Sequence, residues 1–469
     1  MKYAAYGSYE PSKSVWFDQL PSHWQQLRVK HVIERMESGV SVNSDASPAS
    51  NEEIGVLKTS CVYGDQFSPQ ENKRVLDEQI ERVACPVKAN RLIISRMNTP
   101  ELVGSCGYVD HDFPNLYLPD RLWQAVFSKS RKCSPKFAWY YLTSRPAKSA
   151  ISSLAAGTSA SMQNIAQDAF VGIGFPLPPL DEQQTIARFL DAKTAQIDEL
   201  IAKKRQLIAK LKEKRQALIA RTVTRGLPPE AAKAAGLESN PNPEMKDSGV
   251  DFLGVVPKTW NVVRLKHVLN AKKGAIKTGP FGSQLHGSEM LESEIKVFNQ
   301  RTVIDRDISS GDNYISLEKF EELKSFEVFP GDLLVTTRGT IGRCMVVPDG
   351  AEKGILHPCL MRLQLNKIHI TDRYLELLIE ESGYVIDQLR LMSNATTIEV
   401  IYSESLKEVW LAVPPLNEQC KIIEYLDRGA SKLDALVERT VLAIARLTEY
   451  RQALITSAVT GKIDVRATA

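Results

Sequence analysis

The sequence predicts an α+β protein built as an internal repeat, with two globular domains joined by two long antiparallel coiled-coil helices. Two pairs of short motifs recur at one spacing of 236 residues: PSHW at 21–24 with PKTW at 257–260, and PPLDEQ at 178–183 with PPLNEQ at 414–419. A long stretch without helix breakers follows each of the second pair. Similarity at a fixed period indicates duplication, and a repeat of this kind predicts a pseudo-twofold molecule.

The two globular blocks span residues 21–177 and 257–413. Short runs rich in β-branched residues, bounded by Gly, Pro and Asp, predict strands at 56–62, 91–95 and 332–337. Good N-cap residues predict one helix beginning near Ser134 and another near Thr371. Both blocks are therefore expected to be small α+β domains, although their sequences differ strongly from one another.

The framework helices are predicted over residues 178–225 and 414–463. The prolines at the start of each segment block an upstream helix, and Asp181 and Asn417 are predicted N-caps. Residues 181–224 contain no Pro or Gly, and they match residues 417–460 at 18 of 44 positions. A helix of this length spans about 66 Å at about 1.5 Å per residue.

Apolar residues recur along both helices at near-heptad spacing, which predicts a buried stripe. The simplest partner for each helix is the other copy, packed antiparallel. The alternative is that each helix docks on its own domain. The residues expected in the helix–helix contact are Ile197, Leu200, Leu207, Leu211, Leu218, Leu433, Leu436, Ile444, Leu447 and Leu454.

The remaining segments are predicted to be connections. Residues 1–20 form an N-terminal arm, residues 226–256 a linker rich in Pro, Gly and Asn, and residues 464–469 a tail. The arm residues 14–17 (SVWF) align with 250–253 (VDFL) at the repeat spacing. The end of the linker is therefore expected to be the second copy of the arm.

Composition excludes several classes of protein. The 469 residues are 43% hydrophobic and 25% charged, with net charge +3, as in an ordinary globular chain. No run approaches the roughly 18 apolar residues of a membrane span, and the N-terminus lacks the apolar core of a signal peptide. Seven cysteines without a C-x-x-C pair argue against a disulfide framework or a zinc site. These features predict a cytoplasmic protein that does not contact membranes.

Sequence signals for catalysis are weak. The chain lacks the G-x-x-x-x-G-K-[ST] phosphate loop and the Asn/Asp-Pro-Pro-aromatic motif of amino-methyltransferases. The FVGIG segment at 170–174 runs into Pro176 instead of opening a helix. The Glu294-Ile-Lys296 triplet is too common to indicate a nuclease, and His31 and His267 lie in apolar surroundings typical of packed or surface histidines. We therefore expect no catalytic residue, bound cofactor or metal in this chain.

The order block, PPL-[DN]-EQ helix, block, PPL-[DN]-EQ helix resembles the specificity (S) subunit of type I restriction–modification systems, over essentially the whole chain. In block two, residues 274–283 are similar to a glycine-rich motif of that family, and 329–334 and 338–343 also match. In block one, residues 55–59, 95–99 and 101–104 resemble another common subtype of the family. Block one lacks the Gly-Pro-Phe-Gly-Ser sequence.

The resemblance implies that each block is a target recognition domain for one half of a split, asymmetric site in double-stranded DNA. It also implies two modification (methyltransferase) subunits docked on this chain, and two restriction subunits joined through them. S-adenosylmethionine, ATP and magnesium are then expected in those partners. Two rival interpretations remain: a methyltransferase or nuclease acting alone, and a coiled-coil scaffold or DNA-binding protein outside restriction–modification.

Side chains that could contact DNA follow from the chemistry of base recognition, in which Arg pairs with guanine and Asn or Gln with adenine. The candidates are Lys58, Lys73, Arg96, Asn98, Thr99, Lys277, Thr278, Ser283, Gln284, Arg301, Arg338 and Thr340. Residues 201–225 also hold nine Lys/Arg against one acid, whereas residues 437–461 hold three against two. This basic helix face either follows the spacer phosphates, or is solvated or docked on an acidic partner.

Overall fold

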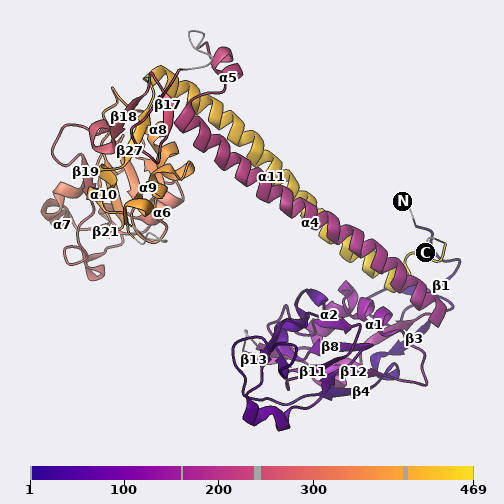
Figure 1. The fold of residues 1–469 in the computed structure, drawn as a ribbon. Helices are drawn as coiled ribbons and strands as arrows, with labels where there is room; N and C mark the ends of the chain where they lie inside the picture. Colours follow the sequence, from indigo (N-terminus) through magenta and orange to yellow (C-terminus); the bar gives the residue numbers. More distant parts are fainter. Residues whose placement is uncertain (1–2, 160–161, 237–243, 394–399, 468–469) are drawn as a thin grey trace. The chain divides into compact units, whose positions relative to one another are not determined.

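The computed structural model describes residues 3–159, 162–236, 244–393 and 400–467. Contacts divide the chain into two units: unit 1 is Met1–Arg205 with Val441–Ala469, and unit 2 is Gln206–Thr440. Each unit therefore contains one globular block and one segment of each long helix (Figure 1). Among the described residues, no helix is long and apolar enough to cross a bilayer.

The block of unit 1 contains two four-stranded sheets. The first is antiparallel, in the order β10 (Cys106–Val109), β8 (Arg91–Ser95), β12 (Leu122–Phe127), β4 (Ile33–Ser38). The second has the order β6 (Asn72–Arg74), β5 (Gly55–Leu57), β11 (Phe113–Tyr117), β7 (Pro86–Val87), and its β5–β11 pair is parallel. Other elements are the 3-10 helices η1 (Val29–His31), η2 (Thr59–Asp65) and η3 (Asp77–Arg82), helices α1 (Pro135–Leu142), α2 (Arg145–Leu154) and α3 (Gln167–Val171), and the small sheet β13 (Ala156–Ser159), β14 (Met162–Asn164), β9 (Met97–Asn98).

The block of unit 2 also contains two four-stranded sheets. The first has the order β19 (Ile276–Thr278), β26 (Leu360–Leu363), β23 (Leu333–Thr336), β24 (Cys344–Val346). The second has the order β21 (Tyr314–Ile315), β20 (Ile295–Phe298), β25 (Gly354–Leu356), β22 (Glu327–Val328), and its β20–β25 pair is parallel. Helical segments are η4 (Leu265–Val268), η5 (Gly287–Glu289), α6 (Gln300–Ile304), α7 (Leu317–Glu322), η6 (Lys324–Phe326), α8 (Asp372–Glu376), the π-helix η7 (Leu377–Glu381), α9 (Tyr384–Ser393) and α10 (Ser403–Lys407).

The two blocks share one topology although their sequences differ. In chain order, β4, β5, β6, β7, β8, β10, β11 and β12 correspond to β19, β20, β21, β22, β23, β24, β25 and β26, and both four-stranded sheets keep the same neighbours. Each also keeps its single parallel pair. The duplication therefore preserved the backbone of the blocks while their side chains diverged.

The strands of the framework recur at the same 236-residue spacing as the sequence motifs, with the same bounds and the same pairing. The arm hairpin β1 (Tyr9–Pro11) and β2 (Gln19–Pro21) has its copy, 236 residues later, in β16 (Met245–Asp247) and β17 (Val255–Pro257). The pair β3 (Gln25–Arg28) and β15 (Gly174–Leu177) likewise corresponds to β18 (Asn261–Arg264) and β27 (Trp410–Val413). The predicted second copy of the arm is therefore present. The linker also holds a short helix, α5 (Pro229–Ala234), which the sequence did not predict.

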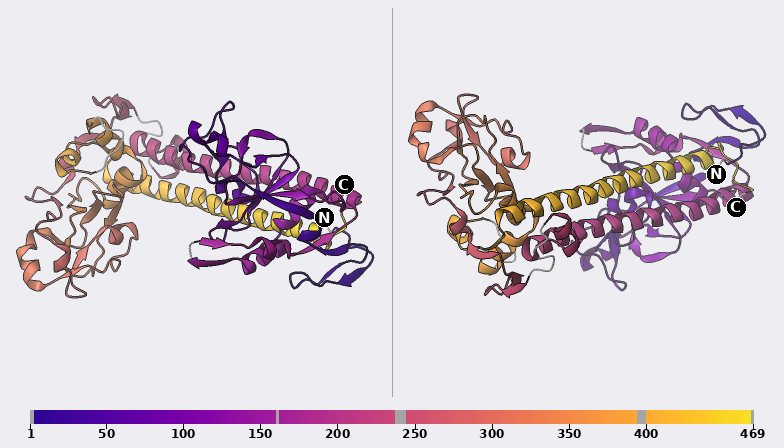
Figure 2. Two further views of the ribbon diagram at one scale, coloured as in Figure 1. Left: turned by 90° about the horizontal axis from the view of Figure 1, so that it is seen from below. Right: turned by 90° about the horizontal axis from the view of Figure 1, so that it is seen from above.

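The long helices are α4 (Leu180–Arg225) and α11 (Leu416–Val459). In unit 1, Ile197 and Ile201 of α4 share one core with Leu454 and Ile455 of α11. In unit 2, residues 219 and 223 of α4 share another core with residues 422 and 426 of α11. The start of each helix meets the end of the other, so the segments run antiparallel and side by side within each unit (Figures 1 and 2).

The predicted contact stripe differs from the observed burial at three positions. Leu200, Leu207 and Leu436 keep 48%, 45% and 47% of their surface exposed. The next residue along the helix, Ile201, Ile208 or Val437, is the more buried one in each case, because one residue turns the helix by about 100°. Among the other predicted contacts, Ile197, Leu433 and Leu454 are buried, and Leu211, Leu218, Ile444 and Leu447 are half-buried.

Element boundaries show which local predictions are right. α1 begins after the N-cap Ser134, whose hydroxyl accepts from the Phe137 N–H, and α8 begins after the N-cap Thr371. The N-caps predicted for the long helices are wrong, because both helices begin one residue earlier, and Asp181 and Asn417 lie in the first turn. The strand predicted over 56–62 is too long, since the chain leaves β5 after Leu57 and turns into η2.

Candidate nucleic-acid interface

A buried glutamine fixes the start of each long helix on its block. In unit 1, the Gln183 amide accepts from the Ser134 N–H at 2.7 Å and donates to the carbonyls of Lys132 and Pro178. In unit 2, Gln419 accepts from the Thr371 N–H at 2.9 Å and donates to the carbonyls of residues 369 and 414. Both glutamines are fully buried. The last residue of each PPL-[DN]-EQ motif therefore joins a long helix to a helix cap in the block.

The tryptophan of each P-x-x-W motif packs where one long helix begins and the other ends. The carboxylate of Glu182 accepts from Tyr6, His23 and the Trp24 indole, at 2.6, 2.8 and 3.1 Å. Burial first, and then the bond to Glu182, raises the pKa of the Tyr6 hydroxyl well above its ordinary value. In unit 2, Trp260 is fully buried at the equivalent position. These contacts make the repeated motifs structural, and they leave the blocks to differ.

At one edge of the first sheet in each block, the ends of the strands and the loops that connect them lie together. In unit 1 the edge is formed by the ends of β8 and β4 and the starts of β12 and β10, since Ser95 pairs with Leu122 and Ser38 with Trp123. In unit 2 it is formed by the ends of β23 and β19 and the starts of β26 and β24. We call these equivalent places the recognition edges, because most candidate DNA-contact residues lie at them.

Three candidates of unit 1 lie in the recognition loop, the segment of residues 96–105 between β8 and β10. The Arg96 guanidinium lies 5.7 Å from the centre of the buried Trp123 ring. Asn98 lies in β9, where its amide contacts the Tyr63 hydroxyl at 3.2 Å. The side-chain amide oxygen of Asn98 accepts from the Thr99 N–H. The Arg96 guanidinium and the Asn98 side-chain amide are therefore both positioned by contacts within the block.

The corresponding recognition loop of unit 2, residues 337–343, carries Arg338 and Thr340. Both side chains are exposed. The loop backbone is fixed by a bond from the Thr337 N–H to the Cys359 carbonyl and by a bridge between Arg338 and Val400. Arg301, on α6, is 73% exposed and lies 3.9 Å from Asp305. These two arginines extend from neighbouring elements at the same edge.

In each block, a helical turn follows one inner strand of the second sheet, β5 or β20, and reaches the recognition loop. We refer to β5 and β20 as the central strands. In unit 1, η2 follows β5 and carries Tyr63, which contacts Asn98. In unit 2, α6 follows β20, and its first residue Gln300 donates to the carbonyl of Arg338. We call η2 and α6 the recognition turns. Sequence reasoning missed Tyr63 and Gln300, which lie six residues beyond β5 and two residues beyond β20. Their place shortly after a buried strand, close to the candidates Lys58 and Arg301, is the signal that could have identified them.

A glycine is required at both recognition edges by close packing. A Cβ at Gly279, which follows β19, would lie 2.1 Å from the carbonyl oxygen of His357. A Cβ at Gly39, which follows β4, would lie 1.6 Å from the carbonyl oxygen of Leu118. The two positions are equivalent in the shared topology. Block one therefore keeps this glycine although it lacks the Gly-Pro-Phe-Gly-Ser sequence.

The remaining candidates lie around these edges. Lys58 follows β5 and pairs with Glu71 at 3.0 Å, and Lys73 lies in the edge strand β6. Lys277 and Thr278 lie in β19, with the Lys277 ammonium 4.6 Å from the centre of the Phe326 ring. The exposed residues Ser283 and Gln284 follow β19, and Gln284 closes a turn with Phe281. All twelve candidates therefore lie in or beside the two blocks, and none lies in α4 or α11.

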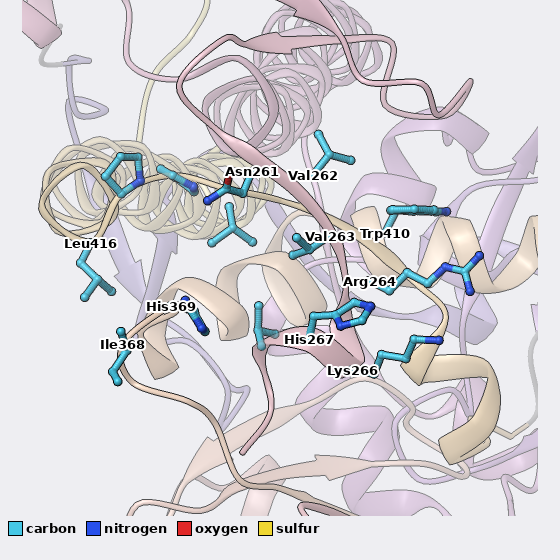
Figure 3. A pocket seen from close by; sticks show the side chains of 14 residues that line it. Asn261, Val262, Val263, Arg264, Lys266, His267, Ile368, His369, Trp410 and Leu416 are labelled. Atoms are coloured by element: carbon cyan, nitrogen blue, oxygen red, sulfur yellow. The ribbon is translucent and has the colours of Figure 1, made fainter. Parts of the chain in front are cut away.

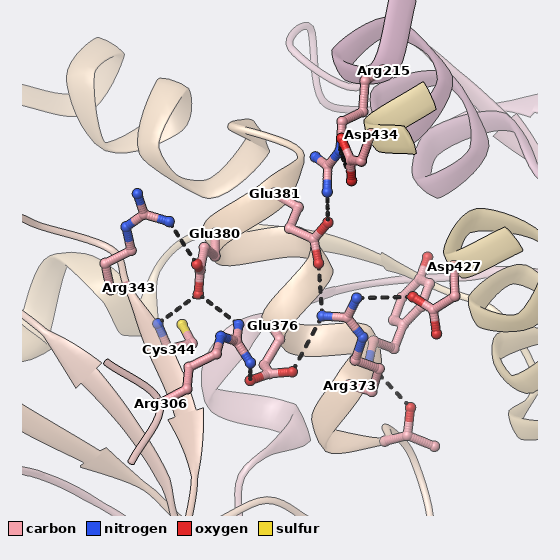
Figure 4. A network of polar contacts seen from close by, with 12 residues as sticks. Arg215, Arg306, Arg343, Cys344, Arg373, Glu376, Glu380, Glu381, Asp427 and Asp434 are labelled. Atoms are coloured by element: carbon pink, nitrogen blue, oxygen red, sulfur yellow. Dashed lines mark hydrogen bonds and ion pairs between the residues drawn. The ribbon is translucent and has the colours of Figure 1, made fainter. Parts of the chain in front are cut away.

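A network of ion pairs in unit 2 joins both long helices to the recognition elements (Figure 4). Arg215 of α4 pairs with Glu381 at 2.9 Å, and Arg373, which shares Glu381, pairs with Asp427 of α11 at 2.9 Å. Glu380 pairs with Arg306 at 3.1 Å. The same carboxylate also binds Arg343 and the Cys344 N–H, at 2.8 and 2.9 Å. The network also includes Glu376, the last residue of α8, whereas Glu380 and Glu381 are the last two residues of the π-helix η7.

Two of these groups show how burial and charge compete. Burial raises the pKa of the Glu376 carboxyl, against the attraction of Arg306 and Arg373. Burial lowers the pKa of Arg373, but its bond to Asp427 and the charge of Glu381 outweigh burial and leave that pKa raised. Arginines and carboxylates thus neutralise one another here. The network therefore connects the long helices to the block of unit 2, and it is not an anion-binding site.

A cavity of about 630 Å³ lies beside β18 and β27, away from the residues of the recognition edge (Figure 3). Arg264 and Lys266 lie at one end near Trp410, and His369, Ile368 and Leu416 line the other end. Glu408 pairs with both Arg264 and Lys266, which offsets their charge. His267 also lines this cavity and is exposed, in accord with the predicted surface histidine.

The other chemical candidates have structural roles. The Lys296 ammonium of the Glu294-Ile-Lys296 triplet is buried and donates to the carbonyls of Ser309 and Gly311 at 3.0 and 2.6 Å. Burial raises the pKa of the Cys133 thiol to about 12 and that of Cys85 to about 11, which disfavours the reactive thiolate. Within the described ranges, no three His, Cys, Asp or Glu side chains gather in a way that could hold a metal ion.

Comparison with known proteins gives one family and a set of remote relatives. The model for the type I restriction modification DNA specificity domain matches residues 21–210 and 257–441. The type I restriction enzyme EcoBI specificity subunit of Escherichia coli is 23% identical over 300 residues, 62% of this chain and 58% of that protein. The StySPI specificity subunit of Salmonella potsdam is 24% identical over 71% of this chain and 66% of that protein. This chain thus spans less than two thirds of either relative.

Other comparisons cover nearly the whole of this chain. The putative MjaX specificity subunit of Methanocaldococcus jannaschii is 21% identical over 97% of both chains. A chain from a solved type I R-M system has a TM-score of 0.65 at 17% identity, with 95% of this chain and 99% of that chain covered. The HsdS subunit from Thermoanaerobacter tengcongensis has a TM-score of 0.51 at 16% identity, with 96% and 100% covered. At these identities, the two solved structures show a shared fold.

Proposed function

This chain belongs to the family defined by the type I restriction modification DNA specificity domain, and on that premise we propose that it selects the DNA sequence for a type I restriction–modification complex. It does so with two target recognition domains, residues 21–177 and 257–413. Each recognises one half of a bipartite, asymmetric site in double-stranded DNA. The N-terminal arm, the linker and both long helices form the framework that carries them.

The observation that carries this proposal is the pair of equivalent recognition edges with different side chains. Both edges have the same strand order, a helical turn at the same place after β5 or β20, and the same required glycine. One presents Arg96 and Asn98, and the other presents Arg338 with Arg301 of the adjacent turn. Arginine, asparagine and glutamine are the side chains that discriminate bases by paired hydrogen bonds. One backbone with two sets of such side chains suits two different half-sites.

We further propose that the framework positions the catalytic partners of the complex. Two modification subunits bind this chain, and two restriction subunits join through them. S-adenosylmethionine, ATP and magnesium act in those partners, and this chain contributes no catalytic residue. The repeat supports two equivalent docking places, because the framework is kept alike in both copies while the blocks diverge. We expect the complex to act in the cytoplasm, where it meets DNA.

The test is selection of bound duplexes from a randomised pool by the purified full-length chain, followed by binding measurements on the enriched sequence. We expect two short specified segments of different sequence, separated by an unspecified spacer of fixed length. Arg338→Ala should weaken binding about 5- to 150-fold, as expected for a base contact worth about 1–3 kcal/mol. The exposed Lys258→Ala, whose side chain pairs with Glu244, is the matched control. A pool without enrichment would refute the proposal.

A further inference from the structure

An ion pair fixes the far end of the recognition turn in both units, with opposite polarity. In unit 1 the turn η2 ends at Asp65, whose carboxylate lies 2.6 Å from the Lys148 ammonium of α2. In unit 2 Arg306 lies two residues beyond the end of α6, and its guanidinium lies 3.1 Å from the Glu380 carboxylate and 3.3 Å from that of Glu376. The acid is on the turn in unit 1 and on the helical segment in unit 2.

Backbone geometry confirms that Asp65 and Arg306 are equivalent. Each lies eight residues beyond the last residue of the central strand, β5 or β20. Each has left-handed φ, 59° for Asp65 and 51° for Arg306. Non-glycine residues rarely adopt this conformation, and it persists where surrounding contacts impose it. The ion pair is one such contact in both units.

The carboxylate of each pair also holds the end of the recognition loop. Asp65 accepts from the Cys106 N–H at 3.2 Å, and Glu380 accepts from the Cys344 N–H at 2.9 Å. Cys106 and Cys344 are the first residues of β10 and β24, the strands to which the recognition loops return. Each acid therefore joins three segments: the recognition turn, the end of the recognition loop, and the helices that follow the sheet.

These contacts are only partly shielded from solvent, since the Arg306 side chain keeps 48% of its surface exposed. The side chains of Asp65 and Lys148 are 29% and 25% exposed, and that of Glu380 is 11% exposed. The Trp139 indole closes the unit 1 site, since it donates to the carbonyls of Asp65 and Cys106 at 2.9 and 3.1 Å. In unit 2, Arg343 takes up the second oxygen of Glu380. A partly buried, hydrogen-bonded pair fixes geometry better than an exposed one, which contributes little.

We infer that Asp65–Lys148 and Arg306–Glu380 are positioning pairs of reversed charge at equivalent recognition turns, each of which sets the geometry of one recognition edge and thereby the selectivity for one half-site. This inference rests on the proposed recognition of a bipartite DNA site. The residues act through Tyr63, Asn98, Gln300 and Arg338, which lie on the turns and loops that the pairs hold. A recognition turn and its helical segment must then be exchanged together between relatives, because the charges match only within one block.

The experiment measures how the full-length chain discriminates the enriched duplex from duplexes with one half-site scrambled. Lys148→Glu should reduce discrimination at one half-site at least tenfold and leave the other within twofold. Arg306→Glu should do the converse. The double variant Asp65→Arg with Lys148→Glu gives unit 1 the polarity of unit 2, and it should restore discrimination to within about threefold of wild type. Lys148→Arg, which keeps the charge, should retain wild-type discrimination.

Wild type and Arg35→Glu, a reversal in the more exposed Arg35–Glu37 pair of β4, are measured in parallel. Lack of discrimination by wild type would refute the proposed function and not the pairing alone. Unchanged discrimination in Lys148→Glu, loss at both half-sites in a variant that melts like wild type, or a folded double variant without recovery would overturn the inference. If Lys148→Glu does not fold, Lys148→Gln takes its place with the same expected loss.

Discussion

At the scale of single residues, close backbone packing requires a glycine at each recognition edge, beside the candidate DNA-contact residues. Gly279 and Gly39 have no room for a Cβ, because the carbonyl of the residue that follows β25 or β11 occupies that space. The sequence showed a glycine-rich motif in block two, but nothing in block one singled out Gly39. Its neighbours Ser38 and Val40 carry no motif, and the crowding carbonyl belongs to Leu118, 79 residues further along the chain. Such a requirement is invisible until the sheets are paired.

Gly279→Ala should therefore distort the unit 2 edge. The inserted methyl must displace backbone, which costs about 1–3 kcal/mol in a packed site. We expect a lower denaturation midpoint in urea and weaker DNA binding. Gly282→Ala is the matched control, since a Cβ there meets nothing within 4 Å. Equal stability and binding of the two variants would show that the backbone contact at Gly279 is misplaced.

His357, which provides the crowding carbonyl, predicts a pH dependence. Burial lowers the pKa of its imidazole below the ordinary value, and the ring Nδ1 accepts from the Cys359 N–H at 3.2 Å. The folded state then favours the neutral ring. Its contribution to stability is present above the unfolded pKa of about 6.5 and is lost as pH falls through the lower folded pKa.

We expect the melting temperature of the wild type to fall between pH 7.5 and pH 5 more steeply than that of His357→Asn. Other groups titrate in the same range, so the difference between the two slopes is the quantity that tests His357. Parallel slopes would mean that the ring is not held neutral by the fold.

At the scale of elements, the sequence predicted what is encoded locally and repeated. The long helices are predicted over 178–225 and 414–463, and both observed helices begin two residues later, directly after the prolines that block an upstream helix. α4 ends where predicted, and α11 ends four residues earlier. The caps at Ser134 and Thr371 follow from local hydrogen-bonding chemistry. The common topology of the blocks could not be predicted, because their strands have only two to six residues and pair across distant parts of the sequence. Burial in such sheets depends on partners and not on a local pattern.

The anchoring of the helices gives a prediction for Gln183. Replacement by Leu would leave the Ser134 N–H and the carbonyls of Lys132 and Pro178 without their buried partner. Each unsatisfied buried group costs about 1–3 kcal/mol, so loss of all three partners should lower the free energy of unfolding by at least about 3 kcal/mol. The neighbouring Gln184 is exposed, and Gln184→Leu should change stability little. Urea unfolding of both variants decides, and similar losses would contradict the anchoring role.

Helix pairing gives a prediction for Leu447. This half-buried side chain of α11 packs against the core of unit 1. Leu447→Asp places a carboxylate among apolar groups and should destabilise by about 2–4 kcal/mol. Leu442, on the same helix, is 52% exposed, and Leu442→Asp should be nearly neutral. Thermal unfolding of both proteins measures the difference, and a Leu447→Asp variant as stable as Leu442→Asp would mean that the contact stripe is wrongly assigned.

At the scale of the whole molecule, the duplication separates a shared framework from two individual recognition surfaces. The hairpins, the P-x-x-W tryptophans and the buried glutamines recur at one spacing of 236 residues. The blocks between them keep their strands and change their exposed side chains. This division of roles could be inferred from the sequence, because conserved and divergent segments alternate. The sequence also indicates candidates at these edges, such as Arg96 and Arg338, whereas the contacts that hold them come from residues distant in the sequence and could not be predicted.

The most direct test is a block exchange followed by methylome sequencing in a host that also expresses the cognate modification subunits. Residues 257–413 are replaced by the corresponding block of a relative with a different target. We predict a bipartite, non-palindromic methylated site in which one half-site changes, while the other half-site and the spacer length stay the same. A continuous palindrome, or a change in both half-sites after this single exchange, would contradict the assignment of one half-site to each block.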